Sequence, residues 1–146
     1  VTPTYDLESA PQDFKDLSSV THDRIINAAK TFVGEILQLP PIFSAIKKDG
    51  EALYELARRG EETELIARPI IIKEFEIVNI RLPEVEFRVV CGTGTYIRSL
   101  AHDMGSMIGC GAYLSKLRRT RIGNHSVIDA VGMEGFLEQV SAKTDI

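Results

Sequence analysis

Tyr96 and Arg98 lie close together within residues 91–100, and their side chains offer an aromatic face for a ring and a guanidinium for an anion. Arg98 falls in the first turn of a predicted helix, where the positive end of the helix dipole disfavours a cation. A residue that opposes its local preference is a candidate for a functional role. The residues alone leave two interpretations open: a binding site, or a surface arginine beside a core tyrosine.

The elements that must position these side chains are a strand before them and a helix after them. Apolar residues alternate with charged ones over 84–91, which predicts a half-buried strand. Apolar residues recur at helical spacing over 97–108, which predicts a helix. Thr95 suits the N-cap of that helix, and Gly109 suits the position just past its end.

Periodicity and turn residues predict further elements along the chain. The predicted helices cover 21–33, 52–57 and 133–140, and the predicted strands cover 35–39, 43–47, 70–81 and 112–122. Strands 70–81 and 84–91 are expected to form an antiparallel hairpin, and Asp49–Gly50 and Gly123–Asn124 are expected to form turns. This mixture favours an α+β fold, with a mixed, mainly antiparallel sheet and flanking helices, over a wound parallel sheet.

Charge is unevenly distributed along this 146-residue chain, which is long enough for one domain with a core. The formal net charge of −4 argues against indiscriminate nucleic-acid binding. Residues 110–128 nevertheless contain no acidic side chain and hold the cluster Lys116, Arg118, Arg119 and Arg121. This cluster indicates either a localised anion-binding face or a solvated edge strand whose charges prevent aggregation.

The sequence lacks the motifs that are typical of several kinds of functional site. The sequence has no phosphate-cradling glycine motif, and its histidines and cysteines lack zinc spacing, so neither a metal nor a cofactor is expected. His102 and Asp103 are interpreted as a solvated helix face, because adjacent helical residues point in different directions. Cys91 and Cys110 are expected to be reduced thiols of a cytoplasmic protein. No apolar run has the length of a membrane helix.

Blocks that keep a common order and spacing cover most of the chain. They include Pro-Pro-x-x-Ser-Ala-x-Lys at 40–47, Gly-Thr-Tyr-Ile-Arg-Ser-Leu at 94–100 and Leu-Arg-Arg at 117–119. Together they resemble the TruB-type bacterial tRNA pseudouridine synthases, which isomerise a uridine in the tRNA T-loop. The resemblance implies a pseudouridine synthase fold and a reaction that needs no metal or organic cofactor.

The resemblance also implies roles for individual residues. Tyr96 corresponds to the family tyrosine beside the target base, and Arg98 to the arginine that pairs with the catalytic aspartate. Leu117 corresponds to the apolar residue that closes over the uracil. The side chains expected to contact RNA phosphates are Lys47, Arg118 and Arg119, with Lys48, Arg58 and Arg121 as further candidates.

The sequence lacks two upstream features of the family's active site, a second tyrosine and the motif that carries the catalytic aspartate. The family's Gly-x-Leu-Asp motif, which carries the catalytic aspartate, does not occur in this chain. We therefore expect residues 1–146 to be the C-terminal portion of a catalytic domain, with the carboxylate partner of Arg98 outside the chain. The expected partners are tRNA and the missing N-terminal half, without a membrane, and exposed sheet edges predict a swapped or edge-paired dimer.

The sequence leaves other functions open. The isolated chain is expected to be inactive as a synthase, because the nucleophile is missing. The basic cluster remains, which supports a function in RNA binding alone. The alternative is a non-catalytic RNA-binding module, and a third possibility is an α+β scaffold without a ligand.

Overall fold

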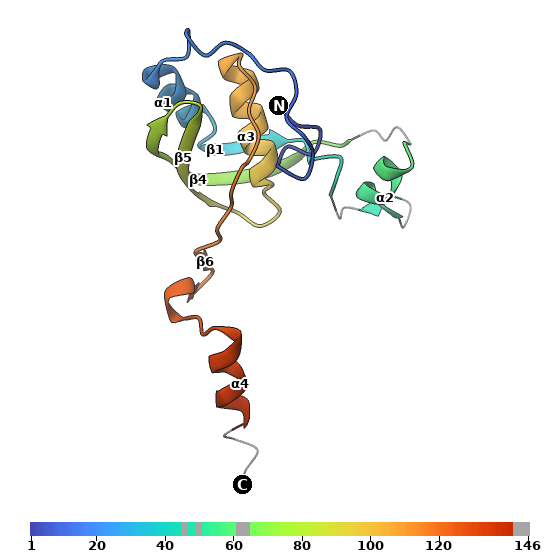
Figure 1. Cartoon of the computed structure of the whole chain (residues 1–146), viewed down its shortest axis with the longest axis vertical. Helices are drawn as coiled ribbons and strands as arrows, with labels where there is room; N and C mark the ends of the chain where they lie inside the picture. Colours follow the sequence, from blue (N-terminus) through green and yellow to red (C-terminus); the bar gives the residue numbers. More distant parts are fainter. Residues whose placement is uncertain (45–46, 49–50, 61–64, 142–146) are drawn as a thin grey trace. The chain divides into compact units, whose positions relative to one another are not determined.

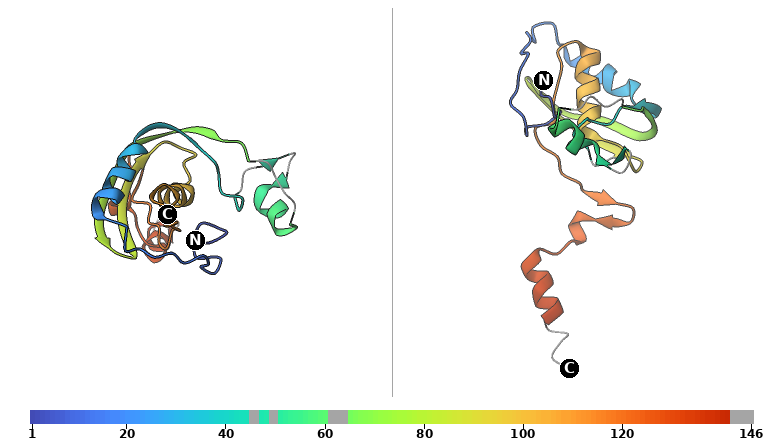
Figure 2. Two further views of the ribbon diagram at one scale, coloured as in Figure 1. Left: turned by 90° about the horizontal axis from the view of Figure 1, so that it is seen from above. Right: turned by 90° about the vertical axis from the view of Figure 1, so that its right-hand side faces the viewer.

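The computed structural model describes residues 1–44, 47–48, 51–60 and 65–141 of the chain. Contacts within it divide the chain into two compact units, Val1–Ser115 and Lys116–Ile146. Figures 1 and 2 show the elements of each unit, and the two units are described separately below.

The first unit is built on a three-stranded antiparallel sheet in the order β1-β4-β5. These strands are β1 (Gly34–Gln38), β4 (Arg68–Arg81) and β5 (Glu84–Cys91). The predicted strands 35–39, 70–81 and 84–91 are confirmed, and so is the antiparallel hairpin. The mixed α+β class predicted from the sequence is therefore correct.

Helices α1 (His22–Thr31) and α3 (Ile97–Ile108) pack against each other, and α1 also contacts β4. The Thr21 side chain caps α1 by accepting a hydrogen bond from the Arg24 N–H at 3.2 Å. Most residues of the apolar face predicted for 97–108 are buried, and the core is formed chiefly by Ile25, Phe32, Ile72, Phe75, Leu100, Met104 and Ile108. Burial of these side chains is the main force that holds α3 against the rest of the unit.

A smaller group of short elements lies between β1 and β4 in the sequence. It contains β2 (Lys47–Lys48), β3 (Glu51–Ala52) and α2 (Leu53–Arg58), and β2 pairs with β3. The predicted helix 52–57 is confirmed. The predicted strand 43–47 is wrong at Phe43 and Ser44, which form a bend after the Pro40–Pro41 pair. The turn predicted at Asp49–Gly50 lies outside the described residues.

Two sequence-based predictions are wrong, one at the start of α3 and one in the chain that follows it. The N-cap is Tyr96 rather than Thr95, whose hydroxyl instead donates to the Gly92 carbonyl at 2.9 Å. The predicted strand 112–122 is also wrong: Leu114 makes a single parallel bridge to Asp6, and only Arg121–Ile122 forms a strand (β6). The segment between them, residues 115–120, is exposed and pairs with no strand in the described part of the chain.

The second unit contains a short hairpin and two helical segments. Strand β6 pairs with β7 (His125–Ser126) across the predicted Gly123–Asn124 turn, and η1 (Val127–Asp129) follows. Helix α4 (Met133–Ser141) confirms the predicted helix 133–140. No helix in the described part of the chain has the length and apolar character needed to span a bilayer. Cys91 and Cys110 are free and half-buried, as predicted.

Gly105 provides a test of how α3 packs against the chain that leaves it. The Gly111 N–H donates to the Gly105 carbonyl at 2.9 Å, and a Cβ added at Gly105 would lie 2.3 Å from the Ala112 nitrogen. Because backbone atoms cannot easily move aside, Gly105→Ala should lower the free energy of unfolding by about 1–3 kcal/mol in chemical denaturation. Gly92→Ala is the control, since its new Cβ would approach no atom closer than 3.7 Å. Equal stability of the two variants would contradict this packing.

Candidate active site

Tyr96 is positioned by a buried glutamine at the end of β1. The Tyr96 N–H donates to Gln38 Oε1 at 2.8 Å, and Gln38 Nε2 donates back to the Tyr96 carbonyl at 3.1 Å. Gln38 is only 3% exposed, so this amide pair is shielded from water. The pair fixes the backbone at the start of α3, and it explains why the helix begins after Tyr96 without a side-chain cap.

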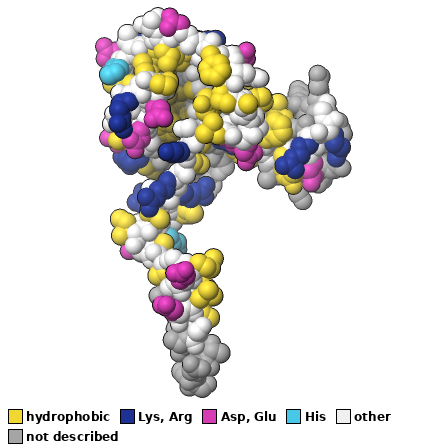
Figure 3. All heavy atoms as spheres, viewed as in Figure 1, with side chains coloured by type: hydrophobic (Ala, Val, Ile, Leu, Met, Phe, Trp, Pro, Cys, Tyr) yellow, Lys and Arg dark blue, Asp and Glu magenta, His cyan; other side chains and the backbone are white. Residues whose placement is uncertain are grey.

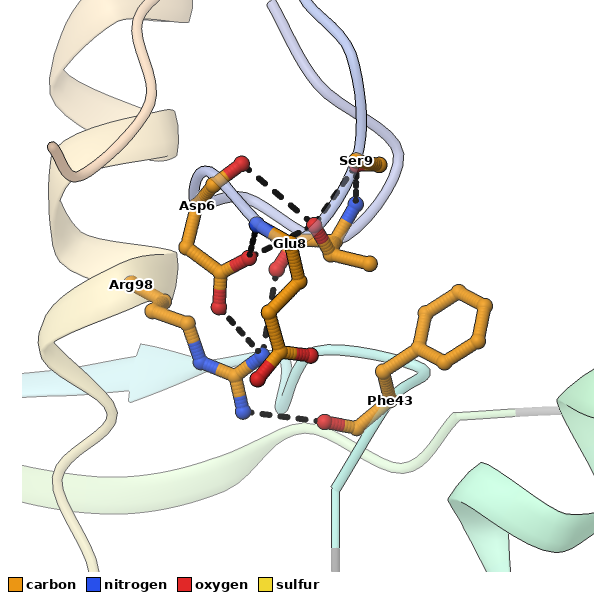
Figure 4. Close-up of polar contacts among 6 residues, drawn as sticks. Asp6, Glu8, Ser9, Phe43 and Arg98 are labelled. Atoms are coloured by element: carbon orange, nitrogen blue, oxygen red, sulfur yellow. Dashed lines mark hydrogen bonds and ion pairs between the residues drawn. The ribbon is translucent and has the colours of Figure 1, made fainter.

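Arg98 donates hydrogen bonds to acceptors from two other segments of the chain. Nη1 donates to the Thr4 carbonyl and to Asp6 Oδ2, both at 3.1 Å, and Nη2 donates to the Phe43 carbonyl at 2.9 Å (Figure 4). The Arg98 and Asp6 side chains are 23% and 18% exposed, respectively. A partly desolvated arginine–carboxylate pair of this kind is strong and well oriented.

The ion pair corrects the expectation that the carboxylate partner of Arg98 lies outside this chain. Asp6 is one such partner, and it already accounts for the cation in the first turn of α3. Arg98 nevertheless has donors left over, because no described residue accepts a hydrogen bond from its Nε–H. Guanidinium carries five N–H donors, so Arg98 can bind a second carboxylate without releasing Asp6.

Asp6 is held ionised by its neighbours. Burial alone would raise the pKa of Asp6, but three groups lower it below its ordinary value: the Thr4 hydroxyl, the Glu8 N–H and the Arg98 guanidinium. The hydroxyl and the N–H donate to Oδ1 at 2.7 and 2.9 Å, so each carboxylate oxygen has a donor. Asp6 is therefore an anchor for the guanidinium rather than a free base.

A cleft of about 450 Å³ lies beside this ion pair. Its walls are formed by Glu8, Phe43, Ser44, Tyr54, Arg58, Tyr96 and Arg98. Tyr96 and Arg98, the two residues singled out in the sequence, therefore line one cleft. Aromatic rings together with guanidinium groups suit a planar ring that carries an anionic group nearby.

The other residues predicted for the site belong to the second unit or to β2. Leu117, Arg118 and Arg119 belong to the second unit and are exposed, and their expected contacts with substrate stay predictions. Figure 3 shows Lys and Arg side chains gathered around the segment that contains β6. Lys47 lies in β2, and its side chain is outside the described part of the structure.

Two residues of this site were not identified as functional from the sequence. Gln38 is hydrogen-bonded to Tyr96, 58 residues away in sequence, and Asp6 is paired with Arg98, 92 residues away. Pairs this far apart in sequence leave no local periodicity. Their place in the blocks that resemble a known family was the one signal available.

The interpretation of His102 and Asp103 as a solvated face is also wrong, because the Tyr5 ring covers His102 and burial raises the pKa of Asp103.

The residues that the structure describes include no group of three or more His, Cys, Asp or Glu side chains that could hold a metal ion.

Comparison with known proteins relates this site to one family. A sequence model described as "TruB family pseudouridylate synthase (N terminal domain)" matches residues 1–97. A second, described as "tRNA pseudouridylate synthase B C-terminal domain", matches residues 98–145. The boundary between the two matches falls within α3, between Tyr96 on one side and Arg98 on the other.

Similar proteins and structures carry related names. The chain is 50% identical over 139 residues to tRNA pseudouridine synthase B of Flavobacterium johnsoniae, covering 95% of this chain and 61% of that protein. It is 43% identical over 147 residues to the Parabacteroides distasonis protein of the same name, covering 99% and 63%. The crystal structure of a Cbf5–Nop10–Gar1 complex matches with a TM-score of 0.55 and 38% identity, covering 71% of this chain and 26% of that one. The chain thus spans about six tenths of the length of these two relatives.

Asp6→Asn tests the electrostatics of the ion pair. Because the folded-state pKa of Asp6 lies below its ordinary value of 3.8, its stabilisation is present above that value and is lost as the pH falls through the lower one. The variant should be less stable than the parent by about 1–3 kcal/mol near pH 7, and the difference should shrink below about pH 4. Chemical denaturation across this pH range measures it, with Asp23→Asn at an exposed position of α1 as the control. A difference independent of pH would contradict the role of the ionised carboxylate.

Proposed function

Since the chain belongs to the TruB family of pseudouridylate synthases, we propose that it is part of an enzyme that isomerises a uridine in the T-loop of tRNA to pseudouridine. The observation that carries this proposal is the cleft lined by both Tyr96 and Arg98. The family resemblance assigns Tyr96 to the target base and Arg98 to the catalytic aspartate. The names of the relatives support a tRNA substrate. Because the chain spans only part of their length, the activity is proposed for the whole enzyme.

The proposed reaction rearranges the nucleotide without adding or removing atoms. The glycosidic bond to nitrogen breaks, and the same base is rejoined to the sugar through carbon, so no redox partner or cofactor is required. The family mechanism uses an ionised aspartate, which in this proposal comes from the part of the enzyme outside this chain. Arg98 would hold that aspartate with its unused Nε–H, because Asp6 and two carbonyls already fix its Nη atoms.

Tyr96 and Leu117 would bind the extruded base. A base must leave the stack at a cost of a few kcal/mol before an enzyme can react with it. Stacking on an aromatic ring and burial under an apolar side chain offset that cost. Lys47, Arg118 and Arg119 would contact the RNA backbone, consistent with the basic cluster around β6.

The remaining features of the proposal concern the whole protein. Residues 1–146 would form the C-terminal portion of the catalytic domain, joined to an N-terminal half that carries the nucleophile. Such a protein would work in the cytoplasm, where it meets tRNA. Without that half, the chain would be inactive, and its free sheet edges would favour a swapped or edge-paired dimer.

A non-catalytic RNA-binding module is the second candidate. The specific observation in its favour is that the Arg98–Asp6 ion pair is complete within this chain, so Arg98 has a partner without any catalytic aspartate. The sequence upstream in the same gene discriminates between the two candidates. A Gly-x-Leu-Asp motif there favours the enzyme, and its absence favours the module.

Arg98→Ala in the intact enzyme tests the proposed reaction. Loss of one preorganised electrostatic group should lower the rate of tritium release from T-loop RNA by about 10²-fold or more. Arg98→Lys should recover little of the rate, because an ammonium cannot reach several acceptors in the plane of a guanidinium. Arg81→Ala is the control for loss of an exposed cation, and the isolated chain should release no tritium. A decrease in the rate of less than about threefold for Arg98→Ala would show that Arg98 has no role in the mechanism.

The basic cluster is tested by the salt dependence of RNA binding. If Arg118 and Arg119 contact phosphates, each single alanine variant should reduce the slope of log Kobs against log salt by roughly one unit. Arg88→Ala is the matched control, because Arg88 is exposed but already paired with Glu74 and Glu76 at 2.8 and 3.0 Å. Slopes equal to that of the parent would show that Arg118 and Arg119 are solvated and do not contact RNA phosphates.

A further inference from the structure

The ring of Tyr5 stacks on the ring of His102, next to the Asp6–Arg98 ion pair. The ring centroids are 3.8 Å apart and the planes differ by 15°, so the two rings are nearly parallel. Tyr5 directly precedes Asp6, and His102 follows Arg98 by one turn of α3. Residues four apart on a helix share a face, so two consecutive side chains of the N-terminal segment contact two consecutive turns of one helix face.

The backbone at Tyr5 makes this double contact possible. In an extended segment successive side chains point to opposite sides, so residues 5 and 6 would not both reach α3. Tyr5 instead has φ of 63°, in the left-handed region that a bulky side chain rarely adopts. Such strain persists only where surrounding contacts hold it, and here the Tyr5 carbonyl accepts from the Leu114 N–H at 2.9 Å.

The stack itself is held by packing rather than by polar contacts. His102 Nδ1 is buried and has no hydrogen-bond partner. Burial lowers the pKa of His102 and raises that of Tyr5, so both rings are neutral near pH 7. A neutral ring at position 102 adds no second positive charge beside Arg98, and its flat face is the feature that contacts Tyr5.

We propose that the Tyr5–His102 stack is a positioning element that sets the direction in which Asp6 holds the Arg98 guanidinium. The inference rests on the proposed function for its kinetic consequence, but the ion pair that it positions is a feature of the structure. Without the stack, the N-terminal segment loses a side-chain contact to this face of α3. Asp6 then moves relative to Arg98, and the guanidinium is no longer aimed into the cleft.

The kinetic test compares variants that remove or keep the stacked ring in the intact enzyme. His102→Ala should slow single-turnover isomerisation at saturating T-loop RNA by about tenfold or more, with the RNA Kd changed by less than about twofold. His102→Phe keeps a flat ring without nitrogens and should stay within about threefold of the parent. His22→Ala, at an exposed position of α1, controls for loss of a histidine. Equal rates for parent and His102→Ala, or equal losses for the Ala and Phe variants, would overturn the proposal.

The structural test does not depend on activity. NMR titration of the Asp6 carboxyl should show that its pKa rises toward its ordinary value in His102→Ala and stays low in His102→Phe. Tyr5→Asn removes the stack from the other side with a residue that tolerates φ of 63°, so it serves if His102→Ala does not fold. An unchanged Asp6 pKa in every variant would overturn the proposal. If the parent enzyme forms no pseudouridine, the proposed function fails, and this titration still decides the role of the stack.

Discussion

The Arg98 guanidinium is a partly buried positive charge whose acceptors come from two segments far from it in sequence. The Thr4 carbonyl and the Asp6 carboxylate belong to the N-terminal segment, and the Phe43 carbonyl follows the Pro40–Pro41 pair. A buried charge without partners would be strongly destabilising, so these contacts order segments that have no regular structure of their own. The cleft beside Arg98 exists because both segments are held in place there.

Other contacts on α3 also hold irregular segments of the chain in place. Arg98, His102 and Gly105 follow one another at helical spacing, and they contact Asp6, Tyr5 and the Gly111–Ala112 backbone in turn. At the start of the helix, the buried Gln38 ties β1 to the backbone of Tyr96. Tyr96, proposed to bind the base, and Arg98, proposed to hold the catalytic aspartate, are thus fixed by contacts that also hold the fold together. Their geometry is set before any substrate arrives, which is how electrostatic preorganisation acts.

The sequence predicted those parts of the structure that depend on local pattern. Strand 84–91 and helix 97–108 were predicted within their observed bounds, because the apolar residues of each bury one face in the core. Residues 115–120 have the composition of a strand but pair with no strand in the described part of the chain, so composition misled there. Asp6 and Gln38 were missed as site residues, because pairing across the chain leaves no trace in local spacing. The family resemblance, rather than periodicity, assigned Tyr96 and Arg98 to a nucleotide site.

We propose that Asp6 and Arg98 act as one unit in catalysis. A double-mutant cycle on the intact enzyme tests it most directly, with single-turnover rates measured for Asp6→Asn, Arg98→Lys and the double variant. If Asp6 acts only by holding Arg98, the double variant should react at about the rate of the slower single variant, because the second change has nothing left to disrupt. Losses that multiply in the double variant would show that the two residues act independently, and they would contradict the account.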